Sequence, residues 1–171
     1  ENNKPQSFMF EAQDRGIIFD VGHGAGSFWF RQAIPALEGG FTPNSISTDL
    51  HIGNVNGVVH DMITTMSKFL CMGMSLEDTI YRSTVTPAEE IGHPELGNLS
   101  VGSEADVAVI KLDTGTFGYT DCGKAKYIGD KKLTCKLTLR AGEVVYDAEG
   151  MTMPLWTEAP EAYWQLRTPK G

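Results

Sequence analysis

The segment from residue 16 to residue 51 most constrains the fold, because it contains two short apolar runs that each end in a polar cluster. The first run, residues 17–21, leads into His23 between glycines, where short residues let the backbone turn sharply and leave the imidazole accessible. The second run, residues 46–50, delivers Asp49. A strand, a helix and a second strand ending on an aspartate place catalytic groups along one edge of a parallel sheet in many α/β proteins. The sequence therefore predicts such an edge here.

Five helices are predicted from apolar residues at three- and four-residue steps and from residues that commonly cap helices. They cover residues 7–15, 28–37, 58–70, 76–83 and 87–91. Ser27 is the expected N-cap of the second helix, and Pro35 inside that helix predicts a kink or a new helix start. Ser75 and Thr86 each precede an acidic residue by three positions, which is the pattern of a helix start.

The composition changes near residue 92, after which short β-like runs alternate with glycines. These runs cover residues 105–111, 135–139 and 143–146, and residues 140–143 have the composition of a hairpin turn. We therefore expect three parts: an α/β unit, a β-rich segment and an irregular C-terminal arm. Their predicted bounds are residues 1–92, 93–153 and 154–171.

The charge and hydropathy of the chain exclude several classes of partner. A net charge of −8, from 14 basic and 22 acidic residues, argues against nucleic acid or an anionic membrane. No apolar run reaches the roughly 18 residues of a membrane span. The three cysteines show no CxxC spacing, which argues against a disulfide framework or a zinc ribbon and favours a reducing, cytoplasmic location.

Several passages resemble a known family. Residues 97–109, GNLSVGSEADVAV, resemble the G-x-L-x-x-G-x-x-A-D-hydrophobic passage with which proteins of the amidohydrolase superfamily return from a catalytic barrel to a small β-sandwich. FDVGHGAGSFWF together with STDLH is similar to one branch, the dihydroorotase-like and D-aminoacylase-like deacetylases that act on N-acyl or O-acyl small molecules. The resemblance spans roughly residues 15 to 150.

The resemblance implies a (β/α)8 barrel with one or two divalent metals, commonly zinc, at its C-terminal rim. In the family, the ligands are an H-x-H pair, two later histidines, often a carboxylated lysine, and an aspartate after the last strand. By position, STDLH corresponds to that last strand, Asp49 to its aspartate, and FDVGHG to the strand before. No H-x-H occurs in the chain.

The missing ligands imply a C-terminal portion of an amidohydrolase: the last strands and helices of the barrel in residues 1–92, then part of the sandwich in residues 93–153. Most metal ligands then lie outside this sequence. An incomplete barrel leaves two sheet edges open, so we expect either the N-terminal remainder of the barrel or a partner chain to pair with them. Alone, the chain is expected to be inactive, and self-association into a homo-oligomer is left open.

Asp49 has the chemistry for two roles, since a carboxylate ligates divalent metals and also takes a proton from metal-bound water. The alternative is a turn aspartate after a strand. His23 could contact substrate, stabilise an oxyanion or ligate metal, and the resemblance favours substrate contact, with Gly24 beside it. The alternative is a histidine that satisfies buried loop carbonyls. If the second strand continues, His51 projects to the same side as Asp49, where it could orient that residue or contact substrate.

The function that the resemblance implies is hydrolysis of an amide or ester bond of a small molecule by metal-activated hydroxide, with Asp49 as general base and then general acid. One alternative is a non-catalytic, truncated homologue that serves as an assembly module. Another is a small α/β protein that binds an anion at the glycine-rich turn, although no Lys or Arg flanks that turn before Arg31.

Overall fold

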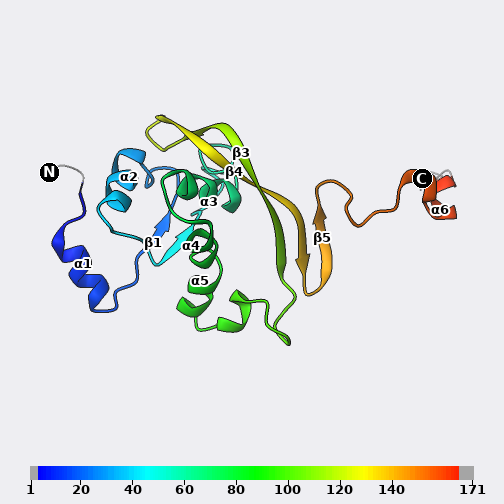
Figure 1. Ribbon diagram of the computed structural model, residues 1–171, viewed down its shortest axis with the longest axis horizontal. Coiled ribbons are helices and arrows are strands. Elements are labelled where there is room, and N and C mark those ends of the chain that lie inside the picture. The colour runs from blue at the N-terminus through cyan, green and yellow to red at the C-terminus, as the bar shows by residue number, and fades with distance from the viewer. Residues whose placement is uncertain (1–3, 166–171) are drawn as a thin grey trace.

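The chain is a mixed α/β structure in which a parallel strand pair and its helices lie at one end and an antiparallel sheet extends from them (Figure 1). The structure, a computed structural model, describes residues 4–165. The α-helices are α1 Ser7–Asp14, α2 Phe30–Glu38, α3 Met62–Cys71, α4 Leu76–Tyr81, α5 Val85–Glu90 and α6 Glu161–Trp164. The strands are β1 Asp20–Gly22, β2 Ser45–Ser47, β3 Val107–Thr120, β4 Lys126–Arg140 and β5 Glu143–Asp147, and two 3-10 helices are η1 Pro94–Gly97 and η2 Trp156–Glu158.

Strands β1 and β2 pair in parallel, with Val21 opposite Ile46, and α2 connects them. This arrangement confirms the predicted strand, helix and strand. Both strands are shorter than predicted. Ile17 and Ile18 are 51% and 54% exposed. The hydrogen bonds of a β-sheet form only between paired strands. Among residues 4–165, β1 and β2 pair only with each other, so each has one open edge.

The two faces of the parallel pair differ in polarity because successive side chains point to opposite sides of a strand. Val21 and Ile46 pack into the core beneath the helices. On the other face, the Asp20 carboxylate accepts hydrogen bonds from the hydroxyl groups of Ser45, at 2.8 Å, and Ser47, at 2.5 Å. This polar face continues toward the ends of both strands.

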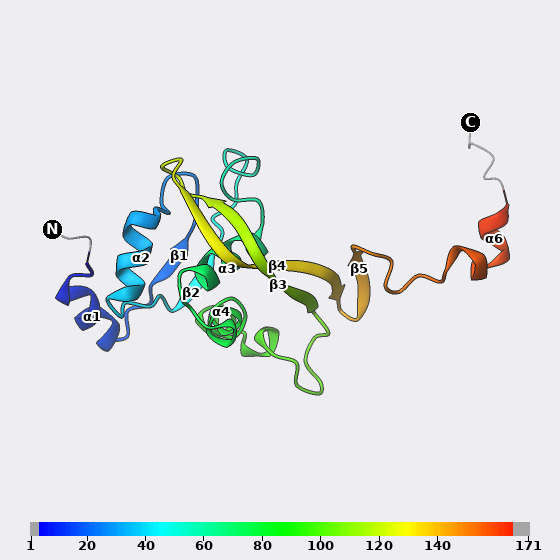
Figure 2. The same ribbon diagram turned by 45° about the horizontal axis from the view of Figure 1, so that its top comes forward.

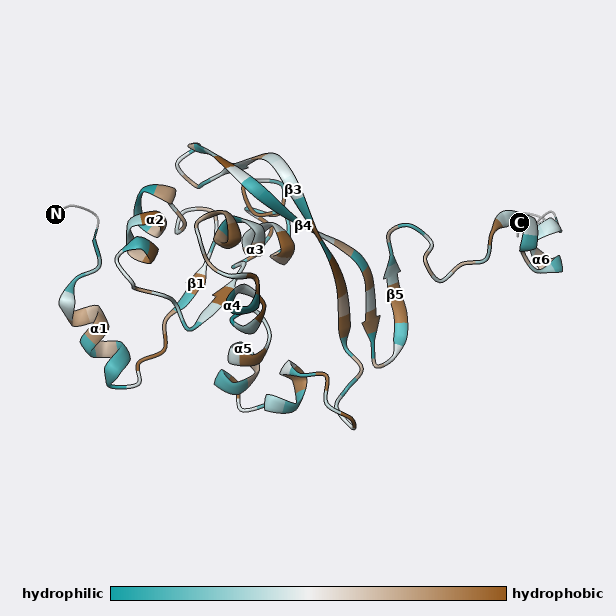
Figure 3. Cartoon of the chain, in the orientation of Figure 1, coloured by the Kyte–Doolittle hydropathy of each residue, from teal (hydrophilic) through white to brown (hydrophobic). Residues whose placement is uncertain are grey.

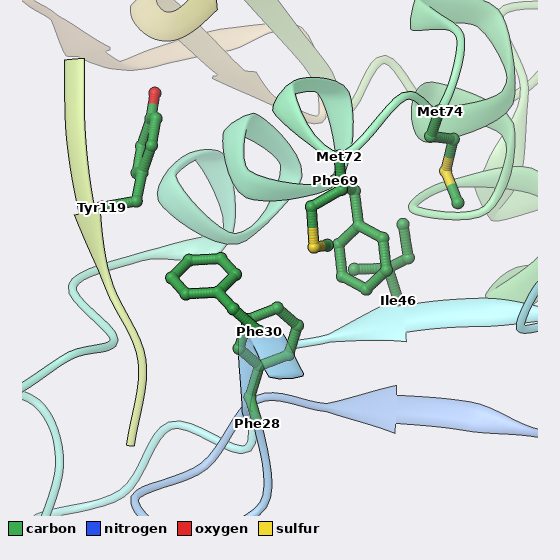
Figure 4. Close-up of a cluster of buried hydrophobic side chains, with 7 residues drawn as sticks. All are labelled: Phe28, Phe30, Ile46, Phe69, Met72, Met74 and Tyr119. Carbon is green, nitrogen blue, oxygen red and sulfur yellow. The ribbon is translucent and has the colours of Figure 1, made fainter. Parts of the chain in front are cut away.

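The hydrophobic core joins the parallel pair to the antiparallel sheet through α3. Figure 4 shows its buried side chains converging from the turn after β1, from α2, β2, α3 and the segment that follows it, and from β3. They are Phe28, Phe30, Ile46, Phe69, Met72, Met74 and Tyr119. A second cluster, Met66, Leu70 and Leu133, joins α3 to β4. The tip of the β3–β4 hairpin therefore belongs to the same packing unit as the parallel pair.

The antiparallel sheet has the strand order β3–β4–β5. The predicted turn at residues 140–143 is confirmed, with Ala141 and Gly142 at φ values of 48° and 80°. The β3–β4 hairpin is much longer than predicted, and its turn between Thr120 and Lys126 was not predicted. Figure 3 shows apolar residues along the part of both strands that lies below α3 in the view. Leu112 on β3 is 42% exposed. Residues 4–165 contain no second sheet packed on this one, so the sandwich remains a prediction, as do the domain bounds.

Three expected helix features differ in the structure. Ser27 does not cap α2; Trp29 is the N-cap, and the Phe30 N–H donates to the distant Asp121 carboxylate. Pro35 lies inside a continuous α2, so no new helix starts there, while the alternative of a kink stays a prediction. The cap expected at Thr86 was also wrong, because α5 begins at Val85, whereas Ser75 caps α4 as predicted.

The C-terminal arm runs from β5 away from the rest of the chain and ends in η2 and α6 (Figure 2). Its aromatic side chains, Trp156, Tyr163 and Trp164, are each more than half exposed. Residues 166–171 of the predicted arm lie outside the described residues. Among the helices that the structure describes, none has both the length and the apolar character needed to cross a membrane.

Candidate active site

The ends of β1 and β2 lie side by side, as the sequence predicted. Backbone hydrogen bonds continue past the strands: the His23 N–H donates to the Ser47 carbonyl at 3.2 Å, and the Gly24 N–H donates to the Thr48 carbonyl at 3.0 Å. These two bonds hold the His23–Gly24 turn against the end of β2. The turn therefore stands beside Asp49.

The Asp49 carboxylate lies directly against Gly24. A Cβ atom built on Gly24 would stand 2.5 Å from Asp49 Oδ2 and 3.3 Å from Ser27 Oγ. Gly24 also has a φ of +55°, a conformation that residues with side chains rarely adopt. Position 24 thus requires glycine for two reasons: its backbone has a positive φ, and a side chain there would collide with the Asp49 carboxylate.

Asp49 itself has an unusual backbone, with a φ of +47° in the left-handed region. Asn54 holds this conformation, because its side-chain amide donates to the Asp49 carbonyl at 2.7 Å and its Oδ1 accepts from the His51 N–H at 2.7 Å. Asn54 is only 2% exposed, whereas Asp49 is exposed. No side chain or N–H in residues 4–165 donates a hydrogen bond to the Asp49 carboxylate. Backbone strain at an exposed polar residue is a common property of functional sites.

His51 does not reach Asp49 in the way that strand periodicity suggested. The strand ends at Ser47, so the rule that alternate residues share a side no longer applies at residues 49 and 51. The His51 ring turns toward its own loop, where Nδ1 accepts from the Gly53 N–H at 3.1 Å. Asn54, which was not predicted, holds the backbone of Asp49 instead. A contact of His51 with substrate remains a prediction.

His23 is fully buried, so the expectation of an accessible imidazole was wrong. The ring stacks on Phe28 with 4.5 Å between centroids. Its Nδ1 lies 3.0 Å from the Gly24 carbonyl, which only accepts, so Nδ1 carries the proton and Nε2 accepts from Lys68 Nζ at 2.7 Å. Burial lowers the pKa of His23 to about 4, although the bond to the Gly24 carbonyl acts in the opposite direction. Both ring nitrogens are used inside the protein.

Lys68 is the most important residue that sequence reasoning missed. It is 1% exposed, and its ammonium donates to His23, to the Val58 carbonyl at 2.9 Å and to the Thr120 carbonyl at 2.8 Å. Burial lowers the pKa of Lys68 to about 8. The only sequence signal was a lysine among the apolar residues of a predicted helix. This signal does not indicate burial of the ammonium group, because lysine stems often cover apolar surface while the charge stays in water.

Asp121 and Cys122 complete the buried surroundings of Lys68. Asp121 is 1% exposed and accepts from the Phe30 N–H at 3.0 Å and from the Ala125 N–H at 2.9 Å. The Cys122 thiol donates to the Gly24 carbonyl at 3.3 Å. The turn between β3 and β4 therefore touches both the start of α2 and the His23–Gly24 turn.

The described residues do not form a metal site by themselves. Residues 4–165 contain no group of three His, Cys, Asp or Glu side chains placed to hold a metal ion. His23 has no free ring nitrogen, and the Asp20 carboxylate is bonded to two serines. Asp49 is the site carboxylate that remains open, and a divalent metal needs more donors than this.

The model of the amidohydrolase family matches residues 30–145, which is more than half of the chain. The chain belongs to the amidohydrolase family. Asp49 lies inside the matched region of this amidohydrolase chain, and the His23–Gly24 turn lies just before it. The predicted resemblance is thereby confirmed.

Relatives and solved structures agree with this assignment. The chain is 33% identical over 146 residues to a deacetylase of Enterococcus faecalis and 39% identical over 130 residues to a deacetylase of Brucella anthropi. These alignments cover 85% and 70% of the amidohydrolase chain but 39% and 32% of the relatives. The chain therefore spans between about a third and two fifths of their length.

Two crystal structures share the fold. That of an adenine deaminase matches with a TM-score of 0.80 and 33% identity, over 84% of this amidohydrolase chain and 39% of the other. That of a dihydroorotase matches with a TM-score of 0.74 and 33% identity, over 83% and 38%. The mixed α/β fold thus corresponds to part of a longer amidohydrolase structure.

Proposed function

We propose that the protein to which this chain contributes hydrolyses an amide or ester bond of a small molecule and so removes an acyl group. The observation that carries the proposal is the Asp49 carboxylate, which is exposed at the end of a parallel strand, bears no hydrogen bond from residues 4–165 and sits on a strained backbone. The deacetylases among the relatives support the acyl-removing class.

In this proposal Asp49 moves the proton. As a water molecule attacks the carbonyl carbon, its proton passes to the Asp49 carboxylate, and a tetrahedral intermediate forms. When that intermediate collapses, the C–N or C–O bond breaks and Asp49 returns the proton to the leaving nitrogen or oxygen. The absence of a side chain at Gly24 leaves room for the carboxylate in this position.

A divalent metal, zinc in the first place, is the cofactor that we propose, with one or two ions bound. Asp49 is the ligand that this chain would supply, and the other ligands come from outside residues 4–165. When bound, such an ion polarises a carbonyl and lowers the pKa of a coordinated water. The proton transfer assigned to Asp49 requires that one oxygen of its carboxylate stays free to accept a proton close to the attacked carbon.

The partner that we propose for the chain is the remainder of the barrel, on the same polypeptide or on another. β1 and β2 each have one strand neighbour among the described residues, and Ile17 and Ile18 before β1 are exposed. Further strands would satisfy the open backbone groups and cover these side chains. A non-catalytic assembly module is the less favoured alternative, since it leaves the strain at Asp49 without a purpose.

The decisive experiment replaces Asp49 by Asn in the complete protein and measures turnover of N-acetyl and O-acetyl substrates. Loss of a general base typically lowers turnover by a factor of about 100 to 10,000, and we expect kcat to fall in this range. Asp14→Asn, an exposed aspartate on α1, is the matched control and should leave kcat unchanged. Near-normal turnover of the Asp49 variant would refute the assigned role.

A further inference from the structure

Lys68 lies where four parts of the chain meet. It projects from α3, and its ammonium donates to the turn after β1 at His23, to the loop before α3 at Val58, and to the end of β3 at Thr120. An ammonium group has three N–H bonds, and all three are used at distances between 2.7 and 2.9 Å. None of them is left for solvent or substrate.

The His23 ring transmits this arrangement to the site. Its Nε2 accepts from Lys68, its Nδ1–H donates to the Gly24 carbonyl, and its face stacks on Phe28. The ring is therefore held at both nitrogens and on one face. The backbone N–H groups of His23 and Gly24 donate to the end of β2, and Gly24 contacts Asp49. If the His23 ring were displaced, Gly24 would move with it, and the Asp49 carboxylate would lose its contact with Gly24.

From these contacts we infer that Lys68 is a positioning residue, whose ammonium fixes the His23–Gly24 turn and thereby the place of the Asp49 carboxylate. This inference rests on the proposed function, in which Asp49 carries the proton. It also gives the β3–β4 hairpin a part in the site, because Thr120 at its end holds the same ammonium group.

Burial of the Lys68 ammonium has an energetic cost that its hydrogen bonds must offset. Burial lowers the pKa of Lys68 to about 8, which means that the fold disfavours the charged form relative to water. Asp121 and Cys122 face it and offset the effect in part, while His23 contributes no charge because burial keeps its ring neutral at pH 7. An apolar side chain at this position would avoid the cost of burying a charge, but it would leave His23 Nε2 and the Val58 and Thr120 carbonyls without their donor. The three directed bonds are what an apolar residue cannot supply.

The test compares Lys68→Met with Ser67→Ala in the complete protein. Ser67 is also 1% exposed and bonds α3 to the hairpin through the Leu133 N–H, but it does not touch the turn after β1. Two quantities are measured: hydrogen exchange at the His23 and Gly24 amides, and kcat and KM for acyl substrates. For K68M we expect exchange at both amides to rise at least about 10-fold above that of S67A, with kcat falling at least about 10-fold and KM nearly unchanged.

The outcomes separate this inference from the proposed function. Equal exchange in K68M and S67A, or a wild-type kcat in K68M, would overturn the positioning role. A wild-type protein without activity on any acyl substrate would count against the proposed function, while the exchange comparison would still report on Lys68. If K68M does not fold, Lys68→Gln retains a hydrogen-bond donor without the charge, and the same increase in exchange relative to S67A is expected.

Discussion

The carboxylate of Asp49 lies so close to Gly24 that a methyl group on Gly24 would stand 2.5 Å from Oδ2. The two residues follow different strands, and the backbone bonds at His23 and Gly24 bring them together. Asp49 is nevertheless an exposed residue, so its carboxylate remains accessible to a substrate and to further ligands. The geometry of the site thus depends on a residue that has no side chain.

Replacing Gly24 by Ala should therefore damage both backbone and site. We expect a loss of about 1 to 2 kcal/mol in the free energy of unfolding, because alanine is strained at a φ of +55°, and a large loss of kcat from the displaced carboxylate. Urea denaturation and steady-state kinetics measure the two effects. Gly26→Ala is the control, since nothing lies within 4 Å of a Cβ at Gly26 and stability should change by less than about 0.5 kcal/mol. Similar results for the two variants would contradict the steric role of position 24.

Asn54 should matter to the site although it bears no reactive group. In Asn54→Ala, the Asp49 carbonyl and the His51 N–H lose their partners, so we expect about 1 to 3 kcal/mol of destabilisation and a reduced kcat. The exposed Asn56 in the same loop is the matched position, and Asn56→Ala should behave as wild type. Denaturation together with kinetics distinguishes the variants, and an Asn54 variant with normal kcat would show that Asp49 keeps its conformation unaided.

The parallel edge could be predicted from the sequence because its signals are local. Apolar runs of strand length, glycines after the first run and an aspartate after the second occur within a few residues of one another. The position of Asp49 follows from these signals alone. The ring of His23 does not, since the flanking glycines determine the turn, while Phe28 and Lys68 determine that the imidazole points inward.

The residues that were missed act over long distances in the chain. Lys68 lies 45 residues from His23, and Asp121 lies 91 residues from the helix start that it caps. Periodicity and capping rules consider neighbours within about four positions, so they assigned Lys68 to a predicted helix and gave the start of α2 to Ser27. Only the folded chain brings the β3–β4 turn to these groups.

Acid should destabilise the fold through His23. Its pKa is 6.5 when unfolded and about 4 when folded, so between these values the unfolded state binds more protons. This contribution to stability is complete above pH 6.5 and is lost as the pH falls through 4, with a maximum of about 3 kcal/mol. Urea denaturation at pH 7 and pH 4.5 should show a smaller difference for His23→Gln than for wild type. The exposed His60 is the control, and His60→Gln should keep the wild-type difference.

Asp121 should stabilise two parts of the chain at once. Its carboxylate accepts from the Phe30 N–H at the start of α2 and from the Ala125 N–H within the β3–β4 turn. Asp121→Ala leaves the buried Phe30 N–H and the partly buried Ala125 N–H without their acceptor, and we expect about 2 to 4 kcal/mol of destabilisation, the sum of a lost cap and a lost turn bond. Asp130→Ala, at an exposed residue of β4, should cost less than about 0.5 kcal/mol.

Hydrogen exchange would then show where the effect of Asp121→Ala falls. Because one carboxylate serves α2 and the hairpin, amides in both should exchange faster in the variant. This result would mean that the predicted boundary near residue 92 separates segments of sequence but not units of stability, since a residue beyond it holds a helix before it. Faster exchange confined to the hairpin would instead indicate that α2 keeps its start without Asp121, and that the two segments unfold independently.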